Sequence, residues 1–143
     1  MPNLTGLSHI DLTVSDIGRS AAWYDGTLGL ERVFETDAPD MFPGHLVNLL
    51  EPSSGLIISM VQHERAVPGE FSEFRVGLDH LAFAVPSRDD LETWVAHFDG
   101  LGVPHSGITD IWYGSVLVFR DPDGIQLELA ALSAILPEPT QGA

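Results

Sequence analysis

Short stretches of this chain alternate between apolar and polar residues with a period of two, which is typical of strands that bury one face. In Ser8–Val14 the apolar positions alternate with His9, Asp11 and Thr13. The same alternation returns in His80–Val85, again with a histidine at the start. Two strands that begin in the same way, about half a chain apart, suggest that the sequence contains a repeat.

A helical pattern follows each of these strands, with apolar residues three or four positions apart. The two predicted apolar stripes are Ile17, Ala21, Tyr24 and Leu28, and Leu91, Trp94, Val95 and Phe98. Ser15 or Asp16 is expected to cap the first helix, and Ser87 with Asp90 resembles a capping box for the second. Glycines 29 and 102 are expected to end the two helices.

Three more strands are predicted after each helix. They are Arg32–Thr36, His45–Leu50 and Gly55–Gln62 in the first half, and Ser106–Thr109, Gly114–Arg120 and Ile125–Leu132 in the second. The turn sequence Asp121–Gly124 is expected to join the last two strands as a hairpin. Each half is therefore predicted to be a βαβββ module.

The repeat defines the predicted organisation of the chain. Its two histidines are 71 residues apart (80 − 9). We predict an α+β fold in which two βαβββ modules form curled mixed sheets around a concave site. A single domain is expected over residues 4–132, composed of module 1 (4–62), a linker (63–77) and module 2 (78–132), with a disordered tail over 133–143.

Composition narrows the classes of function. The chain has 143 residues and a net charge of −15, from 21 acidic and 6 basic residues. Such a charge repels phosphate backbones and anionic lipids, so we expect neither nucleic acid nor membrane as a partner. Cysteine is absent, which excludes disulfides and thiolate chemistry. Neither a membrane span nor a signal peptide is recognisable, so the protein is expected to be cytoplasmic.

Strand alternation places three metal-binding side chains away from the helices. His9, His80 and Glu128 all fall on the polar face of their predicted strands. Two imidazoles and one carboxylate suit Fe(II), Zn, Mn, Ni or Co and leave coordination positions open for a substrate. The alternative is that each is an ordinary exposed or hydrogen-bonded residue, and the paired position of the histidines is the argument against it.

These residues carry a resemblance to a known family. His9 in its strand, the sequence Leu28-Gly29-Leu30, the pair Asp79-His80, and Asp121-Pro-Asp-Gly before Glu128 resemble the vicinal oxygen chelate superfamily. This superfamily includes glyoxalase I, extradiol dioxygenases, and fosfomycin- and bleomycin-resistance proteins. The resemblance covers about residues 4–132 and implies that His9, His80 and Glu128 are metal ligands. It also implies a homodimer.

One position departs from the family. The fourth ligand, usually Glu, Gln or His, aligns with Ser59, whose hydroxyl is a poor ligand at neutral pH. In glyoxalase I this position also supplies the carboxylate that abstracts the proton, so that activity is disfavoured. A set of three protein ligands resembles the metal site of ring-cleaving dioxygenases. Those enzymes commonly contain two copies of the paired βαβββ modules, whereas this chain contains one.

Two weaker candidates for catalysis are His63 and Tyr113. His63 shares strand parity with Ser59 and is a candidate acid or base, although a linker histidine is the simpler interpretation. Tyr113 is a candidate hydrogen-bond donor to a substrate, and an ordinary loop tyrosine is equally compatible. The remaining histidines, 45, 97 and 105, are expected on the surface.

Three functions remain open on the sequence alone. The first is a divalent-metal-dependent enzyme with lyase, isomerase or ring-cleaving dioxygenase activity on a small molecule with vicinal oxygens. The second is a metal-free, drug-sequestering protein like the bleomycin-resistance members, whose acidic surface attracts a cationic antibiotic. The third is an interaction module with a vestigial site.

Overall fold

The computed structural model describes residues 1–37 and 43–133, so residues 38–42, and residues 134–143 of the tail predicted to be disordered, lie outside the described residues. The chain divides into two compact units, Met1–Glu70 (unit 1) and Phe71–Ala143 (unit 2), each described by itself. Unit 1 contains β1 (Ile10–Thr13), α1 (Ile17–Leu28), β2 (Glu31–Asp37), β3 (Gly44–Leu50) and β4 (Ile57–His63). Unit 2 contains β5 (Leu81–Ala84), α2 (Arg88–Leu101), β6 (His105–Ile111), β7 (Gly114–Arg120) and β8 (Gln126–Leu132).

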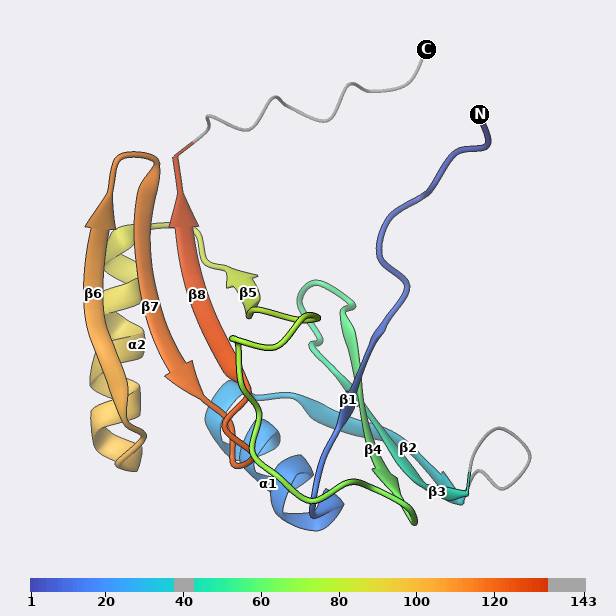
Figure 1. Ribbon diagram of the computed structural model, residues 1–143. Helices are drawn as coiled ribbons and strands as arrows, with labels where there is room; N and C mark the ends of the chain where they lie inside the picture. The colour runs from blue at the N-terminus through green and yellow to red at the C-terminus, as the bar shows by residue number, and fades with distance from the viewer. Residues whose placement is uncertain (38–42, 134–143) are drawn as a thin grey trace. The chain divides into compact units, whose positions relative to one another are not determined.

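Both units have the same sheet topology (Figure 1). The strand orders are β1-β4-β3-β2 and β5-β8-β7-β6. In each sheet the first strand is parallel to its neighbour and the other pairs are antiparallel. The prediction of two βαβββ modules with mixed sheets is therefore confirmed.

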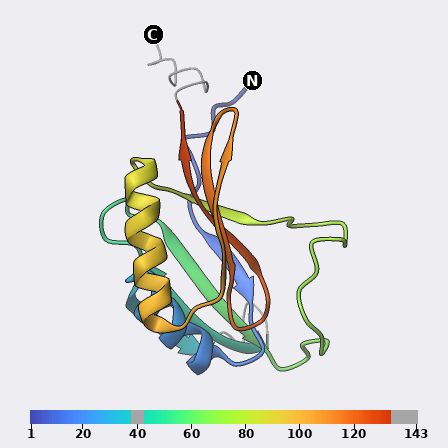
Figure 2. The ribbon, with the colours of Figure 1, turned by 90° about the vertical axis from the view of Figure 1, so that its left-hand side faces the viewer.

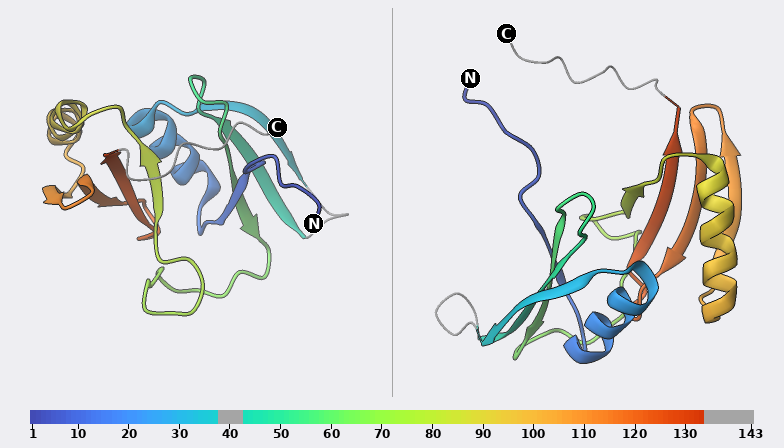
Figure 3. Two further views of the ribbon diagram at one scale, coloured as in Figure 1. Left: turned by 90° about the horizontal axis from the view of Figure 1, so that it is seen from above. Right: turned by 180° about the vertical axis from the view of Figure 1, so that it is seen from behind.

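Each helix packs on one face of its own sheet, as Figure 2 shows for α2 and Figure 3 for α1. We call the opposite face, which the helix of its own unit does not cover, the open face. Between α1 and its sheet the buried side chains include Tyr24 of the helix and Leu12, Leu49, Ile58 and Met60 of the strands. Between α2 and its sheet they include Phe98 of the helix and Leu117, Phe119, Leu127 and Leu129 of the strands. The rings of Phe98 and Phe119 lie 4.7 Å apart between α2 and β7. The sheet face opposite the helix carries Asp11 and Ser59 in unit 1 and Glu128 in unit 2, together with apolar residues such as Val61 and Val118.

Capping residues fix both ends of the helices. The Asp16 side chain accepts a hydrogen bond from the Arg19 amide (2.9 Å), which decides between the two predicted caps of α1. At α2, the Ser87 hydroxyl accepts a hydrogen bond from the Asp90 amide. The glycines 29 and 102 end the helices in the left-handed conformation, with φ of 72° and 69°.

The predicted β7–β8 hairpin is confirmed, and its turn is held by a buried carboxylate. Asp121 accepts hydrogen bonds from the amides of Asp123 (2.9 Å) and Ile125 (2.8 Å). The hairpin sets the register in which Val118 lies opposite Glu128. The turn sequence therefore positions the one carboxylate of the predicted metal site.

Candidate functional site

In unit 2 the open face of the sheet carries His80 and Glu128. Glu128 on β8 is in register with Ala82 on the parallel strand β5. His80 comes two residues before Ala82, so its side chain shares the face of Ala82 and Glu128. The His80 side chain is 39% exposed. The structure thus places two of the three predicted ligands on one face of one sheet.

A neighbouring carboxylate orients the His80 ring. Nδ1 of His80 lies 2.6 Å from Oδ1 of Asp79. When a carboxylate holds one imidazole nitrogen, the other nitrogen is left to bind a metal, and such an outer partner is typical of metal-binding histidines. In this arrangement Nε2 of His80 is the nitrogen available for a ligand bond.

The equivalent positions of unit 1 are His9, Asp11 and Ser59. Asp11 on β1 is in register with Ser59 on β4, as Ala82 is with Glu128, and His9 again comes two residues earlier. Nδ1 of His9 lies 3.0 Å from the Ser8 hydroxyl, and its Nε2 lies 3.8 Å from Oδ1 of Asp11. The repeat in the sequence is therefore also a repeat in strand register.

Ser59 takes the place in unit 1 that Glu128 has in unit 2. Its side chain is 3% exposed, and its hydroxyl donates a hydrogen bond to Oδ1 of Asn48 on β3 (2.9 Å). A buried hydroxyl with this partner stabilises the β3–β4 pair. It does not supply the carboxylate that a proton-abstracting base at this position requires.

The third predicted ligand belongs to the other unit. His9 lies in unit 1, while His80 and Glu128 lie in unit 2. Within residues 1–37 and 43–133, no group of three or more His, Cys, Asp and Glu side chains is arranged to hold a metal ion. The metal site built from these three residues remains a prediction.

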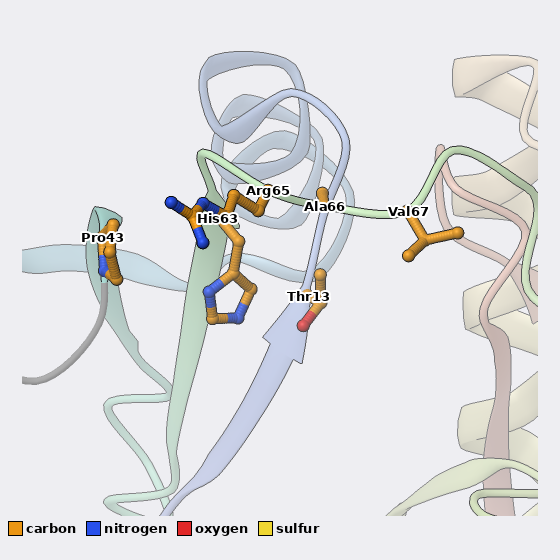
Figure 4. A pocket seen from close by; sticks show the side chains of 6 residues that line it. All are labelled: Thr13, Pro43, His63, Arg65, Ala66 and Val67. Atoms are coloured by element: carbon orange, nitrogen blue, oxygen red, sulfur yellow. The ribbon is translucent and has the colours of Figure 1, made fainter.

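His63, a predicted acid or base, lies in a hollow of unit 1. The hollow has a volume of about 360 Å³ at the ends of β1 and β4 (Figure 4). It is lined by Thr13, Pro43, His63, Arg65, Ala66 and Val67. Figure 4 shows the His63 imidazole between Pro43 and Thr13, below the segment that carries Arg65. The strand β4 ends at His63, so this residue belongs to the sheet as well as to the predicted linker.

Tyr113, the other catalytic candidate, lies in the turn between β6 and β7. Its ring makes an edge contact with Trp112 (5.0 Å between centroids), and its carbonyl accepts a hydrogen bond from the Ser133 amide. Val118, the β7 residue opposite Glu128, is five residues further along the chain. At about 3.3 Å a residue, this separates Tyr113 from Glu128 by roughly 16 Å along the sheet.

The sequence indicated only His63 among the six residues that line the hollow, and one histidine was misplaced. Thr13 and Arg65 were not predicted as site residues, although Arg65 is two positions after His63 and is one of only six cationic residues. The expectation that His105 lies on the surface is wrong. Its side chain is 13% exposed, because it packs near Phe98 and bonds to Asp99 (3.1 Å).

Paired βαβββ units, each opening with a histidine before its first strand, define a class of α+β proteins with repeated modules. The chain belongs to the Glyoxalase/Bleomycin resistance protein/Dioxygenase superfamily, whose pattern matches residues 6–129. The resemblance found in the sequence is thereby confirmed. Neither helix of the described part of the chain is long and apolar enough to cross a membrane.

Similar proteins come from several bacteria. A glyoxylase/bleomycin resistance protein/dioxygenase domain from Frankia sp. EAN1pec is 31% identical, with a TM-score of 0.82 over 91% of this chain and 99% of that one. The fosfomycin resistance protein FosX from Listeria monocytogenes is 20% identical, with a TM-score of 0.71 over 92% of this chain and 94% of that one. This second likeness concerns the fold alone.

A curated relative is longer than this chain. The putative ring-cleaving dioxygenase MhqA from Bacillus subtilis (strain 168) is 26% identical over 132 residues, which are 90% of this chain. The chain spans 40% of the length of that relative. The match therefore covers one part of a larger protein.

Proposed function

We propose that this protein is a divalent-metal-dependent enzyme that acts on a small molecule through two neighbouring oxygen atoms. His9, His80 and Glu128 would hold the cation, and residues 4–132 would act as one functional domain because the ligands come from both units. The observation that carries the proposal is the placement of His80 and Glu128 on one open sheet face, with Asp79 bonded to Nδ1 of His80.

The donor set fits a first-row divalent cation. Two neutral imidazoles and one carboxylate are compatible with Fe(II), Zn, Mn, Ni or Co, and three protein ligands leave positions for two substrate oxygens. When bound, such a cation supplies positive charge that polarises the substrate and templates its oxygens. Asp79 would keep the imidazole of His80 in the orientation that ligand binding needs.

Two further residues would act on the substrate itself. His63, in the hollow at the end of β4, would hold or accept a proton on an imidazole nitrogen. Tyr113 is 39% exposed and its ring lies beside Trp112. Its hydroxyl would donate a hydrogen bond to a more distant part of the substrate. Both roles are part of the proposal.

The comparisons favour some reactions over others. The name of the Bacillus relative supports oxidative ring cleavage, and a FosX structure in complex with Mn(II) supports a divalent cation in this fold. Lyase and isomerase reactions on vicinal oxygens are also included in the proposal. Glyoxalase I activity is disfavoured, because the Ser59 hydroxyl is buried and bonded to Asn48. We include a homodimer in the proposal, as the family resemblance implies.

Metal analysis tests the proposal. Purified protein, stripped with chelator and reloaded with Fe(II), Mn(II) or Zn(II), should retain one ion per chain by inductively coupled plasma mass spectrometry. The variants His80→Ala and Glu128→Gln should lose this ion. His97 lies on the exposed side of α2, so the control variant His97→Ala should retain the ion. Unchanged metal content in His80→Ala would remove the hypothesis.

A second function is supported by charge. The chain carries −15, and its six basic residues are all arginines. A metal-free, drug-sequestering protein would use this charge to attract a cationic antibiotic, and its affinity would fall as salt rises. Protein that takes up no metal but binds a cationic glycopeptide in low salt would favour this function over catalysis.

A further inference from the structure

We propose that the hollow lined by Thr13, Pro43, His63, Arg65, Ala66 and Val67 is a binding site for the acidic group of a small organic anion. The whole hollow belongs to unit 1 and has a volume of about 360 Å³. This volume is within the range of small-molecule pockets, about 300–1,000 Å³. The inference goes beyond the proposed function because the site requires no metal.

Arg65 brings a positive charge to the lining of the hollow. Three of the other five arginines are bonded to acidic side chains, among them the pairs Arg32–Glu35 (2.9 Å) and Arg120–Glu73 (2.7 Å). Arg88 likewise pairs with Asp110 (2.9 Å). No side chain among the described residues forms an ion pair or hydrogen bond with the guanidinium of Arg65. In a chain with 21 carboxylates, a cation that lines a hollow without such a partner is available for an external anion.

The lining of the hollow combines polar and apolar side chains. A guanidinium presents its N–H groups as a planar fork that matches a carboxylate or a phosphonate. The Thr13 hydroxyl and the His63 imidazole add polar groups to the same hollow (Figure 4). The side chains of Pro43, Ala66 and Val67 are apolar. A few polar groups among apolar ones favour an organic acid over a bare inorganic ion.

The hollow lies where β1 and β4 of unit 1 end. Thr13 and His63 share the open face of the sheet with His9, because all three have the same strand parity as the Asp11–Ser59 pair. Thr13 is four residues from His9, which corresponds to about 13 Å along β1. The proposed anion site is thus at the opposite end of β1 from the predicted metal ligand.

Binding to the metal-free, full-length protein tests the inference. Benzoate and phenylphosphonate should bind saturably in isothermal titration calorimetry, and benzamide, the neutral analogue of benzoate, should not. Arg65→Gln should weaken binding by roughly tenfold or more, since hydrogen bonds to charged groups are worth about 1.5–3 kcal/mol. Thr13→Val should weaken it by a smaller factor.

Arg75→Gln is the matched control. Arg75 is also exposed and without a side-chain partner among the described residues, but it lies in unit 2 and outside the hollow. The Arg75→Gln substitution removes the same charge as Arg65→Gln. Because Arg75 lies outside the hollow, this variant should bind both anions as well as the unchanged protein does. The proposal is overturned if neither anion binds, if benzamide binds as well as benzoate, or if Arg65→Gln and Arg75→Gln weaken binding equally. Metal content is not involved, so this test and that of the proposed function fail separately.

Discussion

Ser59 and Glu128 have equivalent places in the two units but opposite chemistry. Each is in register with the residue two positions after a histidine. Glu128 remains partly exposed, while Ser59 is buried and bonded to Asn48. A small hydroxyl with a hydrogen-bond partner is tolerated in such a place, whereas an unpaired carboxylate is costly there. The difference supports one carboxylate in the proposed site.

We predict that Ser59 is structural. Ser59→Ala leaves Oδ1 of Asn48 without its donor in a part-buried place and should lower the free energy of unfolding by about 1–2 kcal/mol. Metal content should not change. Denaturation in urea measures the first effect and elemental analysis the second.

Thr13→Val is the control for this prediction, since it removes an exposed hydroxyl from the same sheet face. Its effect on stability should stay within about 0.5 kcal/mol. Loss of metal in Ser59→Ala, without loss of stability, would show that the serine belongs to the site after all.

At the scale of elements, the strands and caps followed from local patterns. The predicted strand Gly114–Arg120 has the bounds of β7, and the others differ from the observed strands by one to three residues at their ends. The buried stripe of α1 includes Ser20 and Thr27, which the apolar pattern did not indicate. Small polar side chains were buried there because the helix packs closely on β3 and β4.

His45 joins two strands through its ring. Its Nδ1 lies 2.8 Å from Oδ1 of Asp37, and its Nε2 lies 2.7 Å from Oε1 of Glu35. Both partners are acceptors, so the ring makes both hydrogen bonds only when it is protonated. The bond to Asp37 and then that to Glu35 raise the pKa of His45 above its ordinary value of 6.5. The histidine expected on the surface is therefore a pH-dependent link between β2 and β3.

We predict that this link stabilises the protein most at acidic pH and less as pH rises. Because the pKa of His45 is higher in the folded chain than in the unfolded chain, the contribution is complete below about pH 6.5 and is lost as pH rises through the folded value. His45→Gln should therefore lower the melting temperature more at pH 5.5–6 than at pH 8.5, by differential scanning calorimetry. A constant difference between the two proteins across this range would contradict the prediction.

His97→Gln serves as the control for the pH series, because His97 lies on the exposed side of α2 and not between these two strands. It should not reproduce the pH-dependent loss. Glu35 also bonds to Arg32 (2.9 Å), which keeps this carboxylate ionised together with the bond from His45.

At the scale of the whole molecule, charge opposes the compact state. The chain carries −15 at pH 7 and contains no lysine. Self-repulsion of this kind weakens with ionic strength, since the Debye length falls from about 30 Å at 0.01 M salt to about 8 Å at 0.15 M. The arginine–carboxylate pairs are also screened, but exposed pairs are worth about 0–1 kcal/mol each.

We therefore predict that added salt stabilises the protein. The melting temperature should rise by a few degrees as sodium chloride increases over this interval. Choline chloride should give the same rise, because screening does not depend on the cation. A fall in melting temperature would show that the ion pairs outweigh the repulsion.

The sequence by itself determined the modules, their caps and the family. Alternation and helical spacing are local properties, and the repeat of His9 at His80 is visible without coordinates. The pair Asp79–His80 is also local, so its hydrogen bond follows from adjacency. These features depend on residues that are close along the chain.

Only the tertiary structure decided which residues face one another and which are covered. β1 pairs with β4, about 48 residues further along, and this pairing brings Thr13, His63 and Arg65 to one hollow and buries Ser59 beside Asn48. Register and burial arise from contacts between distant segments. No window of the sequence contains them, because the free energy of burial depends on neighbours that only the folded sheet supplies.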